Sequence, residues 1–191
     1  MSNYYERYLN LIDKKVEGFF EQQAPYIKCK KGCSYCCESG SYPITELEFK
    51  YMRLGFSKLD RVKQTLVLQN IRKIKQGRND NEDEFLYQCP FLIDKICCIY
   101  EYRGLICRVF GLPYFDKNDK LKLPACIGIG LNYAEVLDEE KKMLSMEKVE
   151  KLGFSVTPVA FNLSLDTLLN NEAVKTLNLN FGEQKMLVDW F

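Results

Sequence analysis

Residues 29–37 read Cys29-Lys30-Lys31-Gly32-Cys33-Ser34-Tyr35-Cys36-Cys37 and place four thiols within nine positions. The other thiols belong to Cys89, the pair Cys97-Cys98, Cys107 and Cys126. The whole chain has 191 residues, nine cysteines and no histidine. Thiols concentrated in this way are typical of metal ligands or redox groups, so the sequence predicts a site built on cysteine sulfur.

The spacing within this stretch is that of a metal-binding loop. Cys33-Ser34-Tyr35-Cys36 separates two thiols by two residues, which lets the backbone turn back and grip one metal ion. Gly32 eases the tight turn before it. Cys29 lies beyond a wider gap, whereas Cys37 directly follows Cys36, and adjacent side chains do not easily converge on one metal. The adjacency indicates two binding centres, or one ligand beside a supporting residue.

The later thiols are evenly spaced. Eight residues separate Cys89 from Cys98, and eight more separate Cys98 from Cys107. Hairpins of this length would return each thiol to one place. Cys126 is followed by Ile127-Gly128-Ile129-Gly130, where the glycines permit a close approach of the backbone.

In combination, these motifs resemble the bacterial cysteine-cluster proteins of the YkgJ type, described as zinc- or iron-chelating domains with a CxxCxxCC motif. The resemblance covers about residues 29 to 130 and is carried by the first motif, by Cys89-Pro90-Phe91-Leu92, by Cys98-Ile99-Tyr100-Glu101-Tyr102-Arg103 with Cys107-Arg108, and by Cys126-Ile127-Gly128-Ile129-Gly130. The first spacing is wider than in the family, and Gly104 stands where the family usually has proline. Cys97 looks additional to the family pattern.

The resemblance implies eight metal ligands: Cys29, Cys33, Cys36, Cys37, Cys89, Cys98, Cys107 and Cys126. Eight thiolates suit two zinc ions, one four-iron cluster with a further site, or one cluster with spare cysteines, so the expected cofactor is zinc or an iron–sulfur cluster. Filled sites of this kind are negatively charged. We expect nearby cations to offset that charge, namely Lys28, Lys30, Lys31, Arg103 and Arg108.

Three functions stay open. The first is a metal-binding protein, structural or electron-transferring. The second follows from a resemblance to the flagellin lysine methylases, which implies methyl transfer from S-adenosylmethionine to a protein substrate, although no glycine-rich nucleotide motif is present. The third is thiol redox chemistry at Cys36-Cys37 or Cys97-Cys98, without a thioredoxin-like context. The lack of histidine excludes Ser-His and Cys-His hydrolases.

The composition and the N-terminal sequence limit the binding partners and the cellular compartment that we expect. Lys plus Arg is 27 and Asp plus Glu is 26, and this balance predicts no nucleic-acid partner. No stretch approaches eighteen apolar residues, so no membrane association is expected. The N-terminus lacks a secretory pattern, which favours a cytoplasmic location where clustered thiols stay reduced.

The periodicity predicts an α+β protein that is mostly α-helical. We expect a single domain over residues 1–191, with a cysteine-cluster core at about 26–130 and a helical extension at about 131–191. Short strands in residues 85–126, with a turn at Asp94-Lys95, would wrap around a metal or iron–sulfur centre. Residues 78–84 would form a solvated loop.

The expected helices differ in the signals that mark them. Residues 4–22 carry an apolar stripe at helical spacing, and Thr45-Glu46-Leu47-Glu48 has the form of a capping box. A helix at about 57–76 would turn Leu59, Val62, Leu66, Ile71 and Ile74 inward. Further helices are expected at about 132–152, 165–177 and 183–190.

Overall fold

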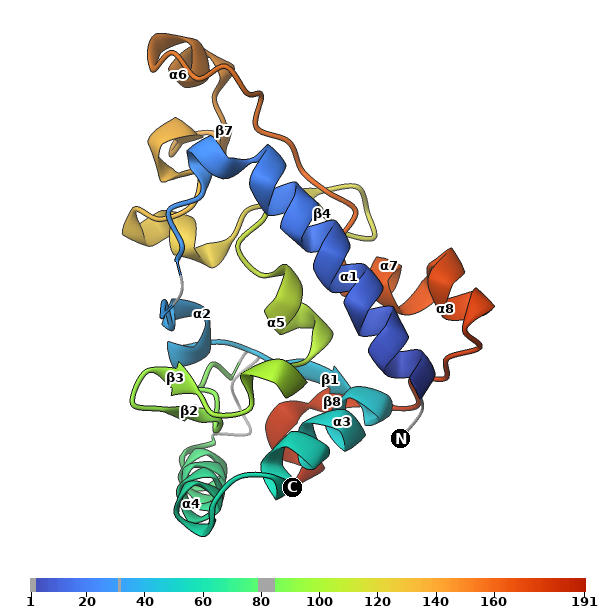
Figure 1. The fold of residues 1–191 in the computed structure, drawn as a ribbon. Coiled ribbons are helices and arrows are strands. Elements are labelled where there is room, and N and C mark those ends of the chain that lie inside the picture. The colour runs from blue at the N-terminus through green and yellow to red at the C-terminus, as the bar shows by residue number, and fades with distance from the viewer. Residues whose placement is uncertain (1–2, 31, 79–84) are drawn as a thin grey trace. The chain divides into compact units, whose positions relative to one another are not determined.

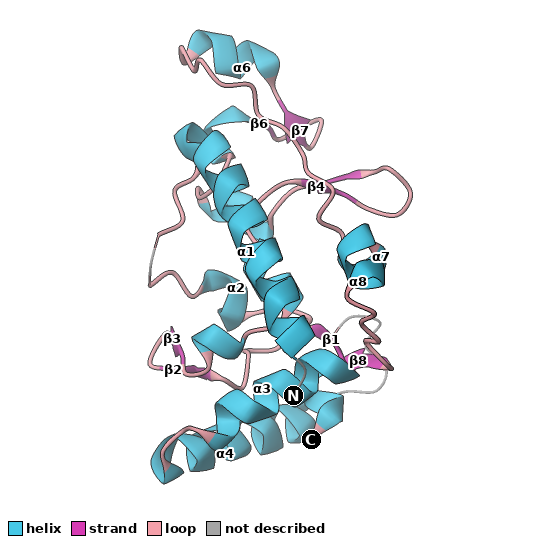
Figure 2. Cartoon of the chain, turned by 45° about the vertical axis from the view of Figure 1, so that its right-hand side comes forward, coloured by secondary structure: helices cyan, strands magenta, loops and turns pink. Residues whose placement is uncertain are grey.

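The computed structural model describes residues 3–30, 32–78 and 85–191. It is an α+β structure, about half helical, whose strands form short antiparallel pairs (Figure 2). The coarse fold class is therefore confirmed. Most of the predicted loop at 78–84 lies outside the described residues. No helix in the described ranges is long and apolar enough to cross a membrane.

The chain divides into two compact units, each made of two separate stretches. Among the described residues, the first unit contains 32–78, 85–107 and 180–191, and the second contains 3–30 and 108–179. The single-domain prediction, with its core at 26–130, stays a prediction. Seven of the nine cysteines belong to the first unit, whereas Cys29 and Cys126 belong to the second.

The first unit is built from helices around very short strands. Its elements are α2 (Tyr35–Glu38), β1 (Pro43–Thr45), α3 (Glu46–Ser57), α4 (Arg61–Gly77), β2 (Leu92–Ile93), β3 (Ile96–Cys97), a 3₁₀ turn (Tyr100–Tyr102), the start of α5 (Leu105–Val109), β8 (Gln184–Met186) and a last 3₁₀ turn (Leu187–Trp190). β1 pairs antiparallel with β8, so the C-terminal segment returns beside residues 43–45 (Figure 1). β2 and β3 form a hairpin.

Both long helices of this unit begin at residues whose side chains satisfy free backbone N–H groups. Thr45 and Glu48 form the predicted capping box of α3. The Asp60 carboxylate accepts a hydrogen bond from Lys63 N at 2.9 Å at the start of α4. The inward face predicted for α4 is partly wrong. Val67 and Ile71 are buried four residues apart, whereas Val62 is 69% exposed.

The predicted inward position of Leu66 is also wrong, since 38% of it is exposed. The buried stripe continues from Val67 and Ile71 to the half-buried Ile74, each three or four residues on from the last. Val62 and Leu66 are also four residues apart, but they lie on a different face of α4. The spacing of apolar residues alone therefore did not identify which face of the helix is buried.

The core of the first unit contains cysteine as well as ordinary apolar residues. Ile44, Phe91 and Leu187 are almost fully buried at its centre. Cys89 belongs to the same buried cluster, and three more cysteines pack against it, namely Cys37, Cys97 and Cys98. Thiols therefore contribute to the packing of this unit.

The second unit contains one long helix and many short elements. They are α1 (Asn3–Gln22), β4 (Tyr114–Phe115), β5 (Leu121–Lys122), β6 (Leu137–Asp138), β7 (Met143–Leu144), α6 (Met146–Lys151), α7 (Leu165–Asn170) and α8 (Glu172–Thr176), with 3₁₀ turns at Ala24–Tyr26, Ala125–Ile129 and Ala134–Val136. The predicted helix at 4–22 is confirmed as α1, whose stripe from Tyr5 to Val16 is buried.

The predicted helix at 132–152 is wrong. The segment forms a 3₁₀ turn, the β6–β7 hairpin and the short α6. Asp138 Oδ1 accepts a hydrogen bond from Lys141 N at 3.0 Å, which closes the hairpin turn locally. Tyr133 and Lys142 have positive φ angles of 63° and 51°. Hydrogen bonds from side chains to the backbone and residues in the left-handed conformation therefore take the place of regular helical hydrogen bonds here.

Two other helix predictions need correction. The helix expected at 165–177 is interrupted at Asn171, whose side chain accepts a hydrogen bond from Val174 N at 3.2 Å and starts α8. The segment at 183–190 forms β8 and a 3₁₀ turn rather than a helix, because β8 pairs with β1. The strand pairing links residues far apart in sequence, so helical periodicity does not report it.

Two helical glycines give opposite stability predictions. A Cβ added at Gly55 would lie 2.6 Å from Tyr102 Cβ, whereas one at Gly18 would meet no described atom within 4 Å. Gly55→Ala should lower the free energy of unfolding by about 1–3 kcal/mol through overpacking. Gly18→Ala should raise it by about 0.5–1 kcal/mol. Urea unfolding of both variants checks this, and the same sign for both would contradict the packing at Gly55.

Candidate functional site

The first thiol motif ends in one turn of helix. In α2, Cys37 N donates to Ser34 O at 2.7 Å, and Ser34 Oγ donates to Glu38 Oε1 at 2.6 Å. The turn places Cys36 Sγ and Cys37 Sγ 4.0 Å apart. The two adjacent thiols therefore lie closer together than their sequence positions led us to expect.

Backbone hydrogen bonds fasten the second cysteine segment to the first. Cys89 N donates to Cys37 O at 2.8 Å. Gly40 and Tyr87 exchange two backbone hydrogen bonds of 3.1 Å each, as in an antiparallel strand pair. Tyr42 Oη also donates to Cys36 O at 3.1 Å. Together these contacts hold the segment around Cys89 beside α2.

The third segment is the β2–β3 hairpin. Leu92 pairs with Cys97, and Cys98 N donates to Phe91 O at 2.9 Å. Asp94 and Lys95 form the turn with positive φ angles of 50° and 62°, the left-handed geometry that two-residue hairpin turns require. The turn predicted from this dipeptide is confirmed, and it fixes the register of both cysteines.

α2, the β2–β3 hairpin and α5 bring three thiols into one electrostatic neighbourhood. Burial, with smaller contributions from Cys97 and Cys36, raises the pKa of Cys107 to about 12. Burial raises the pKa of Cys97 to about 11, with Cys98 and Cys36 adding to it. The hydrogen bond with Cys37, followed by burial, raises the pKa of Cys36. Cys36, Cys97 and Cys107 are therefore neutral thiols at neutral pH without a cation between them.

Cys89 and the phenol of Tyr42 belong to the same neighbourhood. Burial holds the pKa of Cys89 well above its usual value, and the nearby Cys107, Cys97 and Cys98 thiols act in the same direction. Burial also raises the pKa of Tyr42, with contributions from Cys89 and Cys37. Tyr42 was not among the predicted site residues, and no motif in the sequence pointed to it.

Cys97 and Cys98 have different surroundings. Burial raises the pKa of Cys98, but the charged groups that act on it are Lys63 and Asp60 at the start of α4. Those that act on Cys97 include Cys36 and Arg103. Both residues act on Cys89, and Cys97, which looks additional by family pattern, also has the Cys36 thiol of α2 among its neighbours.

The cations predicted to offset thiolate charge fall into two groups. Arg103 lowers the pKa of both Cys97 and Cys107, opposing the effect of burial, and it stacks on Tyr100 at 4.0 Å. Arg108 is buried and pairs with Asp13. Lys28 Nζ lies 3.1 Å from Glu135 Oε2. A charge-balancing position among the thiols is therefore seen for Arg103.

In the second unit, the amide of Asn132 organises the backbone at Cys29. Its Oδ1 accepts hydrogen bonds from Lys28 N at 2.9 Å and from Cys29 N at 2.8 Å, and its Nδ2 donates to Gly111 O at 2.9 Å. Asn132 is fully buried. Cys29 is exposed, and Cys126 is buried in a 3₁₀ turn. Sequence reasoning missed Asn132, because a lone asparagine carries no motif.

A metal site is not already assembled in the described residues. Within residues 3–30, 32–78 and 85–191, no group of three or more cysteine, aspartate or glutamate side chains is arranged to hold an ion. The seven cysteines of the first unit also form no disulfide in the described ranges. The donors are chemically suited to zinc or iron–sulfur, and binding would draw the neighbouring thiols together and release their protons.

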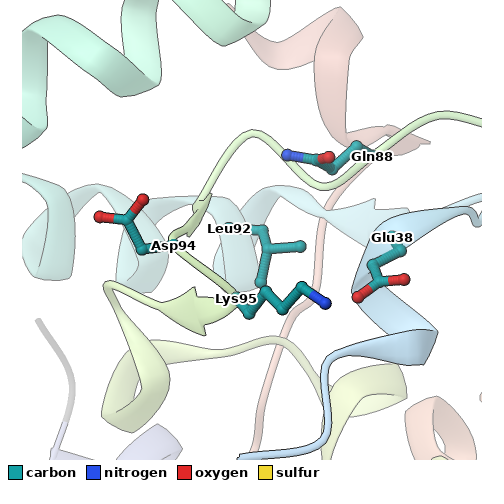
Figure 3. A pocket seen from close by; sticks show the side chains of 5 residues that line it. All are labelled: Glu38, Gln88, Leu92, Asp94 and Lys95. Atoms are coloured by element: carbon teal, nitrogen blue, oxygen red, sulfur yellow. The ribbon is translucent and has the colours of Figure 1, made fainter.

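A shallow pocket of about 340 Å³ opens beside the cysteine segments. Its lining comes from Glu38, Gln88, Leu92, Asp94 and Lys95. Figure 3 shows the Glu38 carboxylate and the Lys95 ammonium pointing toward one another, with Leu92 beside Lys95. Each lining residue lies within three positions of a cysteine in the chain. The pocket is therefore lined by segments of the chain that also carry cysteines.

Comparisons of this chain with protein-family models, with curated proteins and with solved structures found no match.

The raised thiol pKa values predict a loss of stability at alkaline pH in the reduced, metal-free protein. A cysteine in the unfolded chain ionises near pH ~8.5. Cys97 and Cys107 keep their protons until about 11 and about 12 in the folded state. Between these limits the folded state binds more protons, so the free energy of unfolding falls as pH rises, by roughly 1.4 kcal/mol per pH unit for each thiol.

Cys107→Ala provides the test. Urea unfolding between pH 8 and 10.5, a range chosen to bracket the unfolded-state ionisation, should show a shallower decline in the variant than in the wild type. Equal slopes for the two proteins would contradict a protonated, partly buried Cys107.

Proposed function

We propose that the first unit binds zinc or an iron–sulfur cluster through cysteine thiolates. The observation that carries the proposal is the gathering of Cys36, Cys97 and Cys107, from three separate segments, into one neighbourhood. Thiolate sulfur is a soft donor that suits zinc, copper(I) and iron–sulfur clusters better than metal ions that prefer oxygen ligands. The resemblance to the YkgJ-type proteins supports the same conclusion from the motifs.

The electrostatics of the site favour a cation. For a buried cysteine without a positively charged partner, the protonated thiol has a lower free energy than the thiolate. A divalent metal replaces those protons and compensates the resulting thiolates, so that binding and deprotonation become one event. Arg103 is the side chain that already lowers the thiol pKa values and would offset the excess negative charge.

The first unit contains more thiols than one metal centre needs as ligands. The first unit holds six of the eight predicted ligands, Cys33, Cys36, Cys37, Cys89, Cys98 and Cys107, and it also holds Cys97. Structural zinc uses four ligands, so this unit has enough thiols for one centre without those of the second unit. We propose Cys97 as a further ligand because of its neighbours.

Anaerobic purification followed by absorption spectroscopy and metal analysis tests the function and separates the two metals. A broad band at roughly 400 nm identifies thiolate-to-iron charge transfer, whereas a colourless zinc-loaded protein identifies zinc. We expect at least one equivalent of zinc, or iron with matching sulfide. A protein that neither retains zinc or iron nor takes them up in the reduced state would refute the proposal.

Paired serine substitutions test the ligand assignment. Cys97→Ser should weaken retention of the metal by at least about tenfold, because a hydroxyl is a much poorer donor than a thiolate. Cys98→Ser is the matched comparison, one residue away, and should retain more metal, since the Cys36 thiol acts on Cys97 whereas the charged groups that act on Cys98 are Asp60 and Lys63. If Cys98→Ser lost more metal than Cys97→Ser, Cys98 would be the ligand and Cys97 the additional residue, as the family resemblance implies.

A further inference from the structure

Glu48 has contacts beyond those of a helix cap. It is fully buried, and its Oε2 accepts hydrogen bonds from Thr45 N at 2.9 Å and from Thr45 Oγ1 at 2.7 Å. A capping box requires no more than this oxygen. The other oxygen, Oε1, accepts a hydrogen bond from Leu105 N at 2.7 Å, from a residue 57 positions further along the chain.

The contact with Leu105 lies at the start of α5, a helix that is too short to be stable in isolation. α5 has five residues, and isolated helices of that length are unstable because nucleation is costly. The first N–H groups of a helix also lack partners within it. The Glu48 carboxylate supplies a partner for the first N–H of α5 and places a negative charge at its positive end.

The surroundings of Gly104 show how closely the start of α5 is packed. A Cβ at this position would lie 2.7 Å from Ile44 Cδ1 and 3.1 Å from Glu48 Oε1. Only glycine therefore lets the backbone come this close to β1 and α3. Cys107 follows Leu105 by two residues, within the first turn of α5. The placement of its thiol is set by where Glu48 and Ile44 hold the beginning of the helix.

We propose that Glu48 is a positioning residue for the cysteine site, holding Cys107 where the thiols of the other segments can share a metal with it. The inference rests on the proposed function. It assigns the second carboxylate oxygen a role that the capping box leaves open, and it explains why a buried charge is kept at this position. Buried carboxylates are costly unless their hydrogen bonds are complete.

The test measures the affinity of the full-length reduced protein for Zn²⁺, by competition with a chromophoric chelator. Glu48→Ala removes both the cap and the contact with Leu105. The matched control, Thr45→Ala, removes the hydroxyl of the same capping box but leaves Glu48 Oε1 on Leu105 N. We expect Glu48→Ala to weaken zinc binding by about 10- to 100-fold, as loss of a ligand-supporting residue does, and Thr45→Ala to change it little.

Cys107→Ser separates positioning from general stability. If Glu48 acts through Cys107, adding Glu48→Ala to Cys107→Ser should cause no further loss of zinc affinity, although both proteins lose folding stability. Should Glu48→Ala fail to fold, Glu48→Gln keeps the side-chain volume. An amide has one acceptor oxygen for donors on both sides, so its zinc affinity should fall between wild type and Cys107→Ser.

The outcomes are distinguishable. A wild-type protein without zinc affinity would remove the proposed function and, with it, this role of Glu48. A wild-type protein that binds zinc, with Glu48 variants that match Thr45→Ala or that add fully to Cys107→Ser, would overturn the positioning role and leave the function standing.

Discussion

Burial of thiols is the constraint on which the first unit depends. Cys89 lies within the apolar core, and Cys37, Cys97 and Cys98 pack against it. In such surroundings a thiolate is unfavourable, so the protonated form is kept and the pKa of each thiol rises. Under the proposed function, the same burial would favour a soft metal, because a metal supplies positive charge that stabilises thiolates.

The thiols are held together mainly by the backbone. Cys89 N bonds to Cys37 O, Gly40 pairs with Tyr87, and the β2–β3 hairpin closes through Phe91 O. Two side chains add to these main-chain bonds. Tyr42 donates to Cys36 O, and the Glu48 carboxylate links the start of α3 to the start of α5.

Sequence reasoning succeeded where the signal was local. The stripe of residues 4–22, the Thr45–Glu48 capping box and the Asp94-Lys95 turn each depend on residues a few positions apart, and each was found. It failed where distant segments decide the conformation. β8 forms because it meets β1, and the segment at 132–152 follows its own turns rather than its apolar spacing.

The same division applies to the site. Clustering of cysteines in the sequence led us to predict thiolate chemistry, which stays a prediction, whereas which thiols are neighbours depends on folding between segments. The evenly spaced Cys98 has Asp60 and Lys63 near it, whereas Cys97 has Cys36. Glu48 was recognised as part of a cap, while its second oxygen meets a residue far along the chain. Asn132 and Tyr42 carry no motif at all.

The central claim, that cysteine sulfur forms the metal shell, is tested most directly by X-ray absorption at the metal edge of anaerobically prepared, metal-loaded protein. We expect a shell dominated by sulfur at about 2.3 Å, with close to four sulfurs per zinc, and a metal–metal distance in addition if iron–sulfur is present. A shell made mostly of oxygen or nitrogen at about 2.0–2.2 Å would contradict it.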